Sequence, residues 1–135
     1  MRPKDGIVVR TTPLNHTNGA TGYRIEYDDR SICYITDTEH FPDRLNQNIV
    51  DLIKETDIFI YDCTYTDDEY PDHVDWGHST WQEGVKLAAE ADAKTFVVFH
   101  HNPDHDDDAM DSIAASVIAA RPGSVVAREG MTLCP

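Results

Sequence analysis

The amino-acid sequence predicts a layered α/β domain in which a hairpin is followed by alternating strands and helices. Three observations support this class. Runs of strand-forming residues recur along the chain, segments with apolar residues at helical spacing separate the later runs, and no internal repeat or low-complexity linker interrupts them. A length of 135 residues suits one domain with its own hydrophobic core. We therefore expect a single unit over residues 1–135.

The N-terminal part of the chain predicts one strand and then a β-hairpin. Residues 6–13 (GIVVRTTP) read as a short strand, and the Asn- and Gly-rich segment LNHTNGATG reads as a loop. Residues 22–37 (GYRIEYDDRSICYITD) contain two strand-like runs on either side of Asp28–Asp29. This pair suits a tight turn, so the two runs are expected to pair with each other.

The middle of the chain predicts a helix, a buried strand and a long loop. Apolar residues fall at helical spacing within Arg44–Thr56, which follows Pro42 and Asp43. DIFIYD (57–62) reads as a short buried strand. The acidic segment CTYTDDEYPDHVDWGH (63–78) is long for a connection, and long loops are often functional.

The C-terminal part continues the alternation. Ser79 or Thr80 is expected to cap a helix over 80–93 with Glu83 in its first turn, and FVVFH (96–100) reads as a buried strand. Asp106–Asp108 place negative charge at the start of a helix over 107–122, which Pro122 and Gly123 end. SVVAREGMTL (124–133) supplies final strand material.

The charge balance restricts the classes of partner. Eleven Lys and Arg against 25 Asp and Glu give a net charge of −14. Binding to a phosphate backbone needs clustered basic residues, so a large nucleic acid is an unfavourable partner. A small phosphate-bearing substrate remains compatible if a metal ion lies in the site, because the ion is then the largest local charge.

Cysteine content and hydropathy indicate the compartment. The three cysteines, Cys33, Cys63 and Cys134, are widely spaced and form no CxxC, which favours reduced thiols over a disulfide framework. No apolar stretch approaches the length of a membrane span, and the start MRPKDG lacks the apolar region of a signal peptide. We expect a cytoplasmic protein without a membrane segment.

Polar residues recur where the predicted strands end. His16 follows the first strand, and Asp37, Asp62 and His100 end YITD, IFIYD and FVVFH. Strand ends are where α/β proteins assemble their sites, and imidazole with carboxylate suits zinc and similar metals. His78 lies in GHST, just before a predicted helix. A hairpin returns its far end near its origin, so His16 and Asp37 are expected to meet.

Each of these residues also has an ordinary structural explanation. A histidine in a loop is usually solvated, and an aspartate at a strand end is usually a turn-former or a helix cap. Asp62 would then bond a neighbouring backbone group, and His101 and His105 would be surface residues. The segment HHNPDHDDD fits either a metal-binding strand end or a buried strand followed by an acidic helix start. Only the joint pattern favours a metal site.

Two segments resemble a known family. LNHTNGATGYRIEYDDRSICYITDTEH (14–40) and GHSTWQEGVKLAAEADAKTFVVFHHNP (77–103) resemble the second half of metallo-β-lactamase-fold hydrolases. The similarity is greatest to cyclic-phosphate phosphodiesterases and tRNA 3′-processing endonucleases. It implies the C-terminal half of an αββα sandwich, with one mixed sheet and helices on its outer face. The HxHxDH signature, which in that family supplies ligands from the first half, does not occur in this sequence.

The resemblance also implies a role for each candidate residue. His16 and His100 would be metal ligands and Asp37 would bridge two metals, zinc or manganese. His100 fits better than His101 because the family places two residues between the ligand and the proline. His78 would be the catalytic proton donor or transition-state stabiliser. Asp62, His101 and His105 are candidates for supporting positions behind the ligands.

The family membership implied by these motifs leaves two functional hypotheses. The first is a metal-dependent hydrolase acting on a small phosphodiester, of which this chain carries half of a dinuclear site. The second is a non-catalytic α/β binding or assembly module that keeps the fold.

The apolar strands predict a partner under either hypothesis. Strands that are apolar on nearly every residue are typical of a sheet covered on both faces, and two or three helices cover only one. We therefore expect a homo-oligomer or pairing with an N-terminal half, and weak or partial metal binding by this chain alone.

Overall fold

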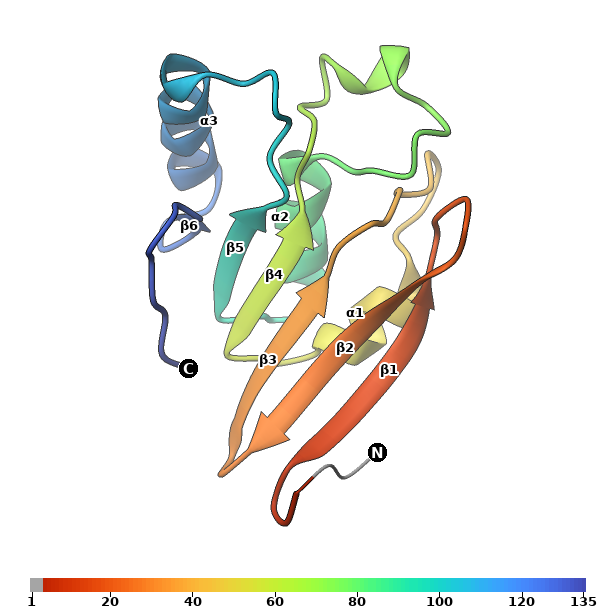
Figure 1. Cartoon of the computed structure of the whole chain (residues 1–135), viewed down its shortest axis with the longest axis vertical. Helices are drawn as coiled ribbons and strands as arrows, with labels where there is room; N and C mark the ends of the chain where they lie inside the picture. Colours follow the sequence, from red (N-terminus) through yellow and green to blue (C-terminus); the bar gives the residue numbers. More distant parts are fainter. Residues whose placement is uncertain (1–3) are drawn as a thin grey trace.

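A six-stranded mixed sheet in the order β1-β2-β3-β4-β5-β6 is the framework of the structure, a computed structural model that describes residues 4–135 (Figure 1). The strands are β1 (Val8–Leu14), β2 (Ala20–Tyr27), β3 (Arg30–Ile35), β4 (Ile58–Asp62), β5 (Thr95–Phe99) and β6 (Val125–Val126). The helices are α1 (Gln47–Ile53), α2 (Trp81–Glu90) and α3 (Asp107–Ala120), with a short 3₁₀ helix η1 (Tyr70–Asp72). The predicted α/β class is confirmed. Residues 1–3, the start of the MRPKDG segment, lie outside the described residues.

The hairpin forms where the sequence predicts it. Strand β2 pairs antiparallel with both β1 and β3. Asp28 and Asp29 form the turn with φ angles of 49° and 59°. A two-residue hairpin turn of this kind needs positive φ at both central positions, and aspartate tolerates that region better than most residues.

The second half of the sheet is parallel. Strands β3, β4, β5 and β6 run in the same direction, and helices α1, α2 and α3 connect them. Strand β1 also runs this way, because two antiparallel pairings separate it from β3. The carboxyl ends of β1, β3, β4 and β5 therefore share one edge of the sheet, at the top of Figure 1.

The helices begin at side-chain caps. Thr80, rather than Ser79, caps α2 by accepting the N–H of Glu83 at 3.2 Å, and Asp106 caps α3 by accepting the N–H of Ala109 at 2.9 Å. Helix α1 is shorter than the predicted Arg44–Thr56. Asn46 ends the preceding loop, and its side chain accepts the N–H of Asn48, so the helix starts at Gln47.

The hydrophobic core lies between the sheet and the three helices. Cys33, Ile35, Phe59, Tyr61, Phe96 and Val98 point to this side, and their relative exposure does not exceed 1%. Ile49 and Ile53 of α1, Leu87 of α2 and Val117 of α3 close the layer from the other side. Burial of this apolar surface is the main stabilisation of the fold.

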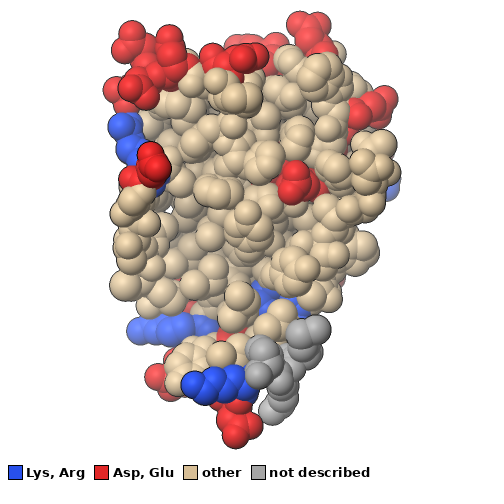
Figure 2. All heavy atoms as spheres, viewed as in Figure 1, with Lys and Arg blue, Asp and Glu red and all other residues tan. Residues whose placement is uncertain are grey.

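Among residues 4–135, no helix lies over the opposite face of the sheet. Tyr23, Ile25, Tyr27 and Tyr34 are 40–59% exposed there. Tyr23 and Tyr34 lie in one row across the strands with Ile60 and Val97, and Ile25 lies in another with Ile32 and Ile58. Ile58 and Val97 are buried, so the exposed part of this face lies over β2 and β3. Figure 2 views this face and shows few charged side chains over its middle, with charges gathered at the rim. We call this surface the open face.

The structure gives the state of the cysteines and the length of the apolar helices. Cys33 and Cys63 are buried free thiols, and Cys134 is an exposed free thiol. Within residues 4–135, no helix combines the length and the hydrophobicity that a transbilayer segment requires.

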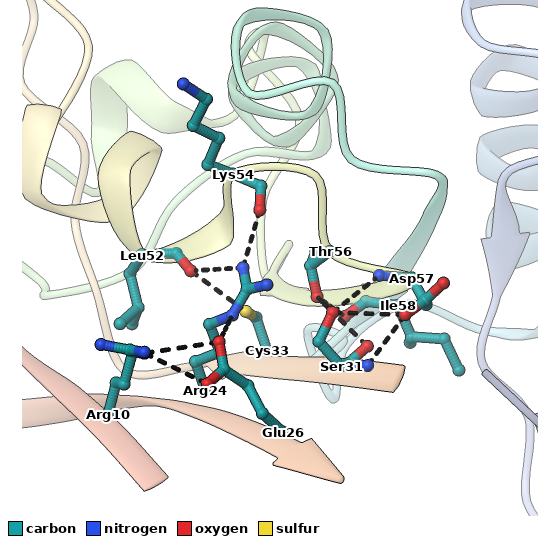
Figure 3. A network of polar contacts seen from close by, with 10 residues as sticks. All are labelled: Arg10, Arg24, Glu26, Ser31, Cys33, Leu52, Lys54, Thr56, Asp57 and Ile58. Atoms are coloured by element: carbon teal, nitrogen blue, oxygen red, sulfur yellow. Dashed lines mark hydrogen bonds and ion pairs between the residues drawn. The ribbon is translucent and has the colours of Figure 1, made fainter. Parts of the chain in front are cut away.

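A polar network fastens the hairpin to the rest of the sheet at the edge opposite the carboxyl ends (Figure 3). The Arg24 guanidinium donates to the carbonyls of Leu52 and Lys54 at 3.0 and 2.7 Å, which satisfies the C-terminus of α1. The Asp57 carboxylate accepts the N–H of Ser31 at 2.8 Å. The Lys94 ammonium lies 2.7 Å from the other oxygen of Asp57. These bonds set the register of β3 and β4.

The substitution Asp57→Asn tests this network through its pH dependence. The hydrogen bond from Lys94 holds the pKa of Asp57 below its ordinary value of 3.8. A lowered folded-state pKa stabilises the fold above 3.8, and that contribution is lost as the pH falls through the folded pKa. We expect the variant to lose about 1–3 kcal/mol of unfolding free energy at neutral pH. The difference from the unsubstituted chain should shrink at acidic pH in denaturant titrations.

Asp43→Asn is the matched control, because the Asp43 side chain is 74% exposed and pairs only loosely with Arg44 at 3.8 Å. It should leave stability unchanged at every pH. A pH-independent loss in Asp57→Asn would contradict the proposed role of the carboxylate charge.

Candidate metal centre

The carboxyl edge of the sheet gathers the strand-end residues singled out in the sequence. His16 follows β1, Asp37 follows β3, Asp62 ends β4 and His100 follows β5. His78 reaches the same place from the loop between β4 and α2. The expected convergence of His16, Asp37 and His100, with His78 nearby, is therefore present in the structure.

Two overlapping groups of side chains could each hold a metal ion. His16, Asp37 and His78 form one group, and Asp62, His78 and His100 form the other. Within each group the possible ligand atoms lie within 4.8 Å of one another. His100 Nε2 also lies 3.6 Å from Asp37 Oδ1, which links the two groups. His78 belongs to both, and its ring centroid lies 5.0 Å from that of His100 and 6.1 Å from that of His16.

The backbone is strained at two of these positions. Asp37 and His100 have φ angles of 59° and 61°, in the left-handed region that most L-residues avoid. Such conformations persist where surrounding structure enforces them, and they concentrate at functional sites. Here both lie within two residues of the end of a parallel strand, and their side chains approach each other to 3.6 Å.

Asp62 is the buried hub of the cluster. Its side chain has 0% exposure. One oxygen accepts the Thr64 hydroxyl at 2.8 Å and the N–H groups of Thr64 and Ser79 at 3.3 and 3.4 Å. The other accepts the N–H of Thr38 at 3.2 Å and lies 2.9 Å from His78 Nδ1. These donors compensate for the loss of water around a buried charge.

The bond to Asp62 fixes the state of His78. A carboxylate only accepts hydrogen bonds, so Nδ1 of His78 carries the proton between them. This hydrogen bond raises the pKa of His78 above its usual value, and burial opposes the shift. Nε2 has no hydrogen-bond partner among residues 4–135, so it is the nitrogen left to bind a metal or hold a proton.

Thr64 orients His100. Its hydroxyl lies 2.8 Å from the His100 carbonyl oxygen and 3.0 Å from His100 Nδ1, besides its bond to Asp62. With Nδ1 engaged, Nε2 of His100 points toward Asp37. Histidine ligands are commonly held this way, with one ring nitrogen bonded to the protein and the other directed at the metal.

Gly77 makes room for His16. A Cβ at this position would lie 2.6 Å from His16 Cδ2 and 2.9 Å from Nε2. Its φ of +86° is also unfavourable for any other residue. The His16 ring therefore packs directly on the backbone that precedes His78.

His101 and His105 lie outside both groups. His101 Nε2 is 2.9 Å from the carbonyl oxygen of Ala127, and its Nδ1 is buried without a partner among residues 4–135. His105 Nε2 is 2.6 Å from a Glu69 oxygen. These two histidines therefore bond residues outside the cluster. Asp62, the third residue suggested for a supporting position, bonds His78 directly.

Sequence reasoning missed Thr64 and Glu39. Thr64 bonds two members of the cluster, and Glu39 lies beside it in a hollow of about 550 Å³. This hollow is lined by His16, Glu39, His40, Phe41, Pro42, Tyr70, Val74 and other residues of the same loops. The only local signal is that Thr64 and Glu39 each lie two residues after a strand-end aspartate. In a chain with 25 acidic residues, that signal does not separate a buried carboxylate from a solvated one.

Comparison with known proteins identifies the family. The family model described as "Beta-lactamase superfamily domain" matches residues 2–101. The chain belongs to the beta-lactamase superfamily. Among curated members, a ribonuclease Z of Saccharolobus solfataricus is 36% identical over 61 residues, which is 45% of this chain and 20% of the relative.

Two solved structures share the fold at low identity. The metallo-beta-lactamase fold protein YhfI from Bacillus subtilis superposes with a TM-score of 0.76 at 18% identity, covering 96% of this chain and 50% of that one. The zinc-bound PqqB from Methylobacterium extorquens gives 0.71 at 18% identity, covering 100% and 52%. The chain thus spans about half the length of these superfamily members, and at this identity the likeness concerns the fold alone.

The pair Gly77→Ala and Gly123→Ala tests the contact between Gly77 and His16. Both glycines have φ +86°, but an added Cβ at Gly123 meets nothing within 4 Å. Each variant should lose about 1–2 kcal/mol from the left-handed backbone. Only Gly77→Ala should lose more, and only it should shift the His16 ring resonances in NMR spectra. Equal losses with unchanged His16 resonances would contradict the packing described here.

Proposed function

We propose that this chain carries half of a dinuclear metal site of a hydrolase that cleaves phosphodiesters. The observation that supports it most is the convergence of His16, Asp37 and His100 at one edge of the sheet: Asp37 Oδ1 lies 3.6 Å from His100 Nε2, and Asp37 shares a group of possible ligands with His16. Membership of the beta-lactamase superfamily and the similarity to a ribonuclease Z agree with this reaction class.

The residues present fit divalent metal ions. Imidazole nitrogens and carboxylate oxygens are the donors that zinc and manganese take, and each group offers both kinds. His16, Asp37 and His100 would hold the two ions. Bound there, the ions would supply an activated water and polarise a phosphoryl oxygen. The ligands of this chain leave each ion short of a full shell, so we expect weak binding by the isolated chain.

The chain's own proton chemistry resides in His78 and Asp62. The Asp62 carboxylate holds the Nδ1 proton of His78 at 2.9 Å and favours the charged imidazolium. Nε2 can then hold a proton next to the position of a phosphoryl leaving group. Donation from Nε2 would neutralise the charge that develops on the leaving oxygen.

The charge distribution favours a small substrate. In Figure 2 acidic side chains gather along the edge that carries the site, and much of the Lys and Arg lies toward the opposite end. With a net charge of −14, this surface repels a long phosphate backbone and offers few cations to bind it. A single phosphodiester needs only the local charge of bound metal. We therefore propose a small phosphodiester rather than a large RNA.

The substitution His78→Ala tests this assignment in an assembly that contains the complete site. Turnover of a chromogenic phosphodiester should fall roughly 10²–10⁴-fold, the usual contribution of a positioned proton donor. Metal content, measured by elemental analysis, should stay the same. His100→Ala is the reference variant and should lose metal. Stoichiometric loss of metal in His78→Ala would instead make His78 a ligand.

The open face indicates that this chain packs against a partner. Exposed apolar side chains on β2 and β3 form this surface: Tyr23, Ile25, Tyr27 and Tyr34. Their rows continue to Ile58 and Ile60 of β4. Soluble monomers rarely expose apolar patches beyond a few hundred Å². We propose that the open face is covered in the working protein by the N-terminal half of the same fold. In the isolated chain a second copy would take its place.

Measurement of molar mass tests this association. Light scattering of the isolated chain at tens of micromolar, roughly the range in which exposed apolar surface drives association, should give more than the mass of one chain. Replacing Ile25 and Tyr34 by Lys should yield monomers. Ile118→Lys is the control, because Ile118 is 52% exposed but lies on α3, away from the open face. A stable monomer of the unsubstituted chain would overturn the proposal.

A further inference from the structure

Glu39 is a buried carboxylate that belongs to neither group of possible ligands. It lies two residues after Asp37 and is 8% exposed. Oε1 accepts the Tyr70 hydroxyl at 2.6 Å and the N–H of Asp75 at 2.8 Å. Oε2 accepts the N–H of Gly77 at 3.0 Å. Every one of these donors comes from the long loop between β4 and α2.

The main chain of Glu39 is fastened to a second segment. Its N–H donates to the carbonyl oxygen of Asn15 at 2.8 Å, and its carbonyl oxygen accepts Asn15 Nδ2 at 3.1 Å. Asn15 directly precedes His16 in the loop after β1. Glu39 lies in the loop that follows β3 and bonds the loops that follow β1 and β4. These three loops lie at the top edge in Figure 1.

Two of the residues that bond Glu39 lie directly before a member of the cluster. Asn15 precedes His16, Gly77 precedes His78, and Glu39 itself is two residues from Asp37. His16 also packs on the α-carbon of Gly77. A movement of Glu39 would therefore be transmitted to His16 and His78 through one peptide unit each.

The β4–α2 loop needs such an anchor. It runs for 18 residues, 63–80, and carries exposed apolar residues, with Val74 at 51% and Trp76 at 62% exposure. An ordered loop of this length gives up much conformational entropy, which its hydrogen bonds and ring contacts must offset. Charge-assisted bonds from backbone N–H groups to a buried carboxylate are among the strong ones.

We propose that Glu39 is the positioning residue of the metal site: it holds the His16 and His78 loops at a fixed distance from Asp37 without binding metal itself. The part of this inference that concerns metal binding rests on the proposed function. The part that concerns the arrangement of the loops can be tested without metal. Glu39 fixes the positions of His16 and His78 through its bonds to Asn15 and Gly77.

The substitution Glu39→Gln removes part of the anchor at nearly constant volume. Glutamine keeps one acceptor oxygen, and its amide nitrogen would face the N–H of either Asp75 or Gly77. At least one of the two backbone bonds is therefore lost. Hydrogen exchange of the affected amide should accelerate roughly tenfold, as expected for one hydrogen bond. The ring resonances of His16 and His78 should shift.

Zinc affinity is the second readout. Loss of a group that orients metal ligands typically weakens metal binding about 10–100-fold. Competition with a chromophoric chelator should show a drop of this size for Glu39→Gln. Tyr70→Phe is the graded variant: it removes the hydroxyl bond but leaves both amide bonds, so Gly77 should stay protected and zinc affinity should fall less.

Asp57→Asn is the matched control for a merely structural effect. Asp57 is also a buried carboxylate that accepts a backbone N–H, but it lies at the opposite edge of the sheet. It should lower thermal stability without changing zinc affinity or the histidine resonances. If Asp57→Asn weakens zinc binding as much as Glu39→Gln, the specific role of Glu39 is refuted.

The outcomes separate this inference from the proposed function. An unsubstituted chain that binds no zinc would refute the metal site, and hydrogen exchange and the histidine resonances would still decide on Glu39. Unchanged exchange of Asp75 and Gly77 with unchanged resonances in Glu39→Gln would overturn the inference. So would equal zinc affinity in the variant and the unsubstituted chain.

Discussion

The buried charge of Asp62 is the constraint on which the site depends. A carboxylate with 0% exposure is strongly unfavourable unless hydrogen-bond donors surround it. Its donors come from Thr38 after β3, from Thr64 after β4, and from His78 and Ser79 before α2. All of these segments must pack around Asp62, because the carboxylate would lack a hydrogen-bond donor if any one of them were displaced. The hydrogen bonds to Asp62 thus bring the residues of the cluster together without a metal ion.

The position of His78 follows from the same constraint. Its Nδ1 is bonded to Asp62, so Nε2 is the ring nitrogen that is left to bind a metal or carry a proton. The raised pKa of His78 favours a protonated ring, which suits a proton donor better than a metal ligand. Asp62 therefore directs His78 in two ways, by orienting the ring and by stabilising its charge. In our proposal this separates His78 from His16 and His100, although all three lie within one cluster.

The parallel half of the sheet explains why the site and the open face occur in one chain. Parallel strands bring their carboxyl ends to a single edge, which gathers Asp37, Asp62 and His100. They also place apolar side chains on both faces, and the three helices cover only one. The longer superfamily structures match this chain over about half their length. In the proposed assembly, one additional layer covers the open face and supplies the remaining ligands.

The sequence by itself determined the local features: the Asp28–Asp29 turn, the Asp106 cap, the alternation of strands and helices, and the strand-end places of His16, Asp37 and His100. These follow from patterns within a few residues, which are readable along the chain. The start of α1 was set too early because Leu45 continues the helical spacing, whereas it packs on the core from outside the helix. Only the tertiary structure decided the roles of Glu39 and Thr64 and the partners of His101 and His105. Their bonds join segments distant in sequence, and a carboxylate or hydroxyl carries no local mark of whether its partner is water or another loop.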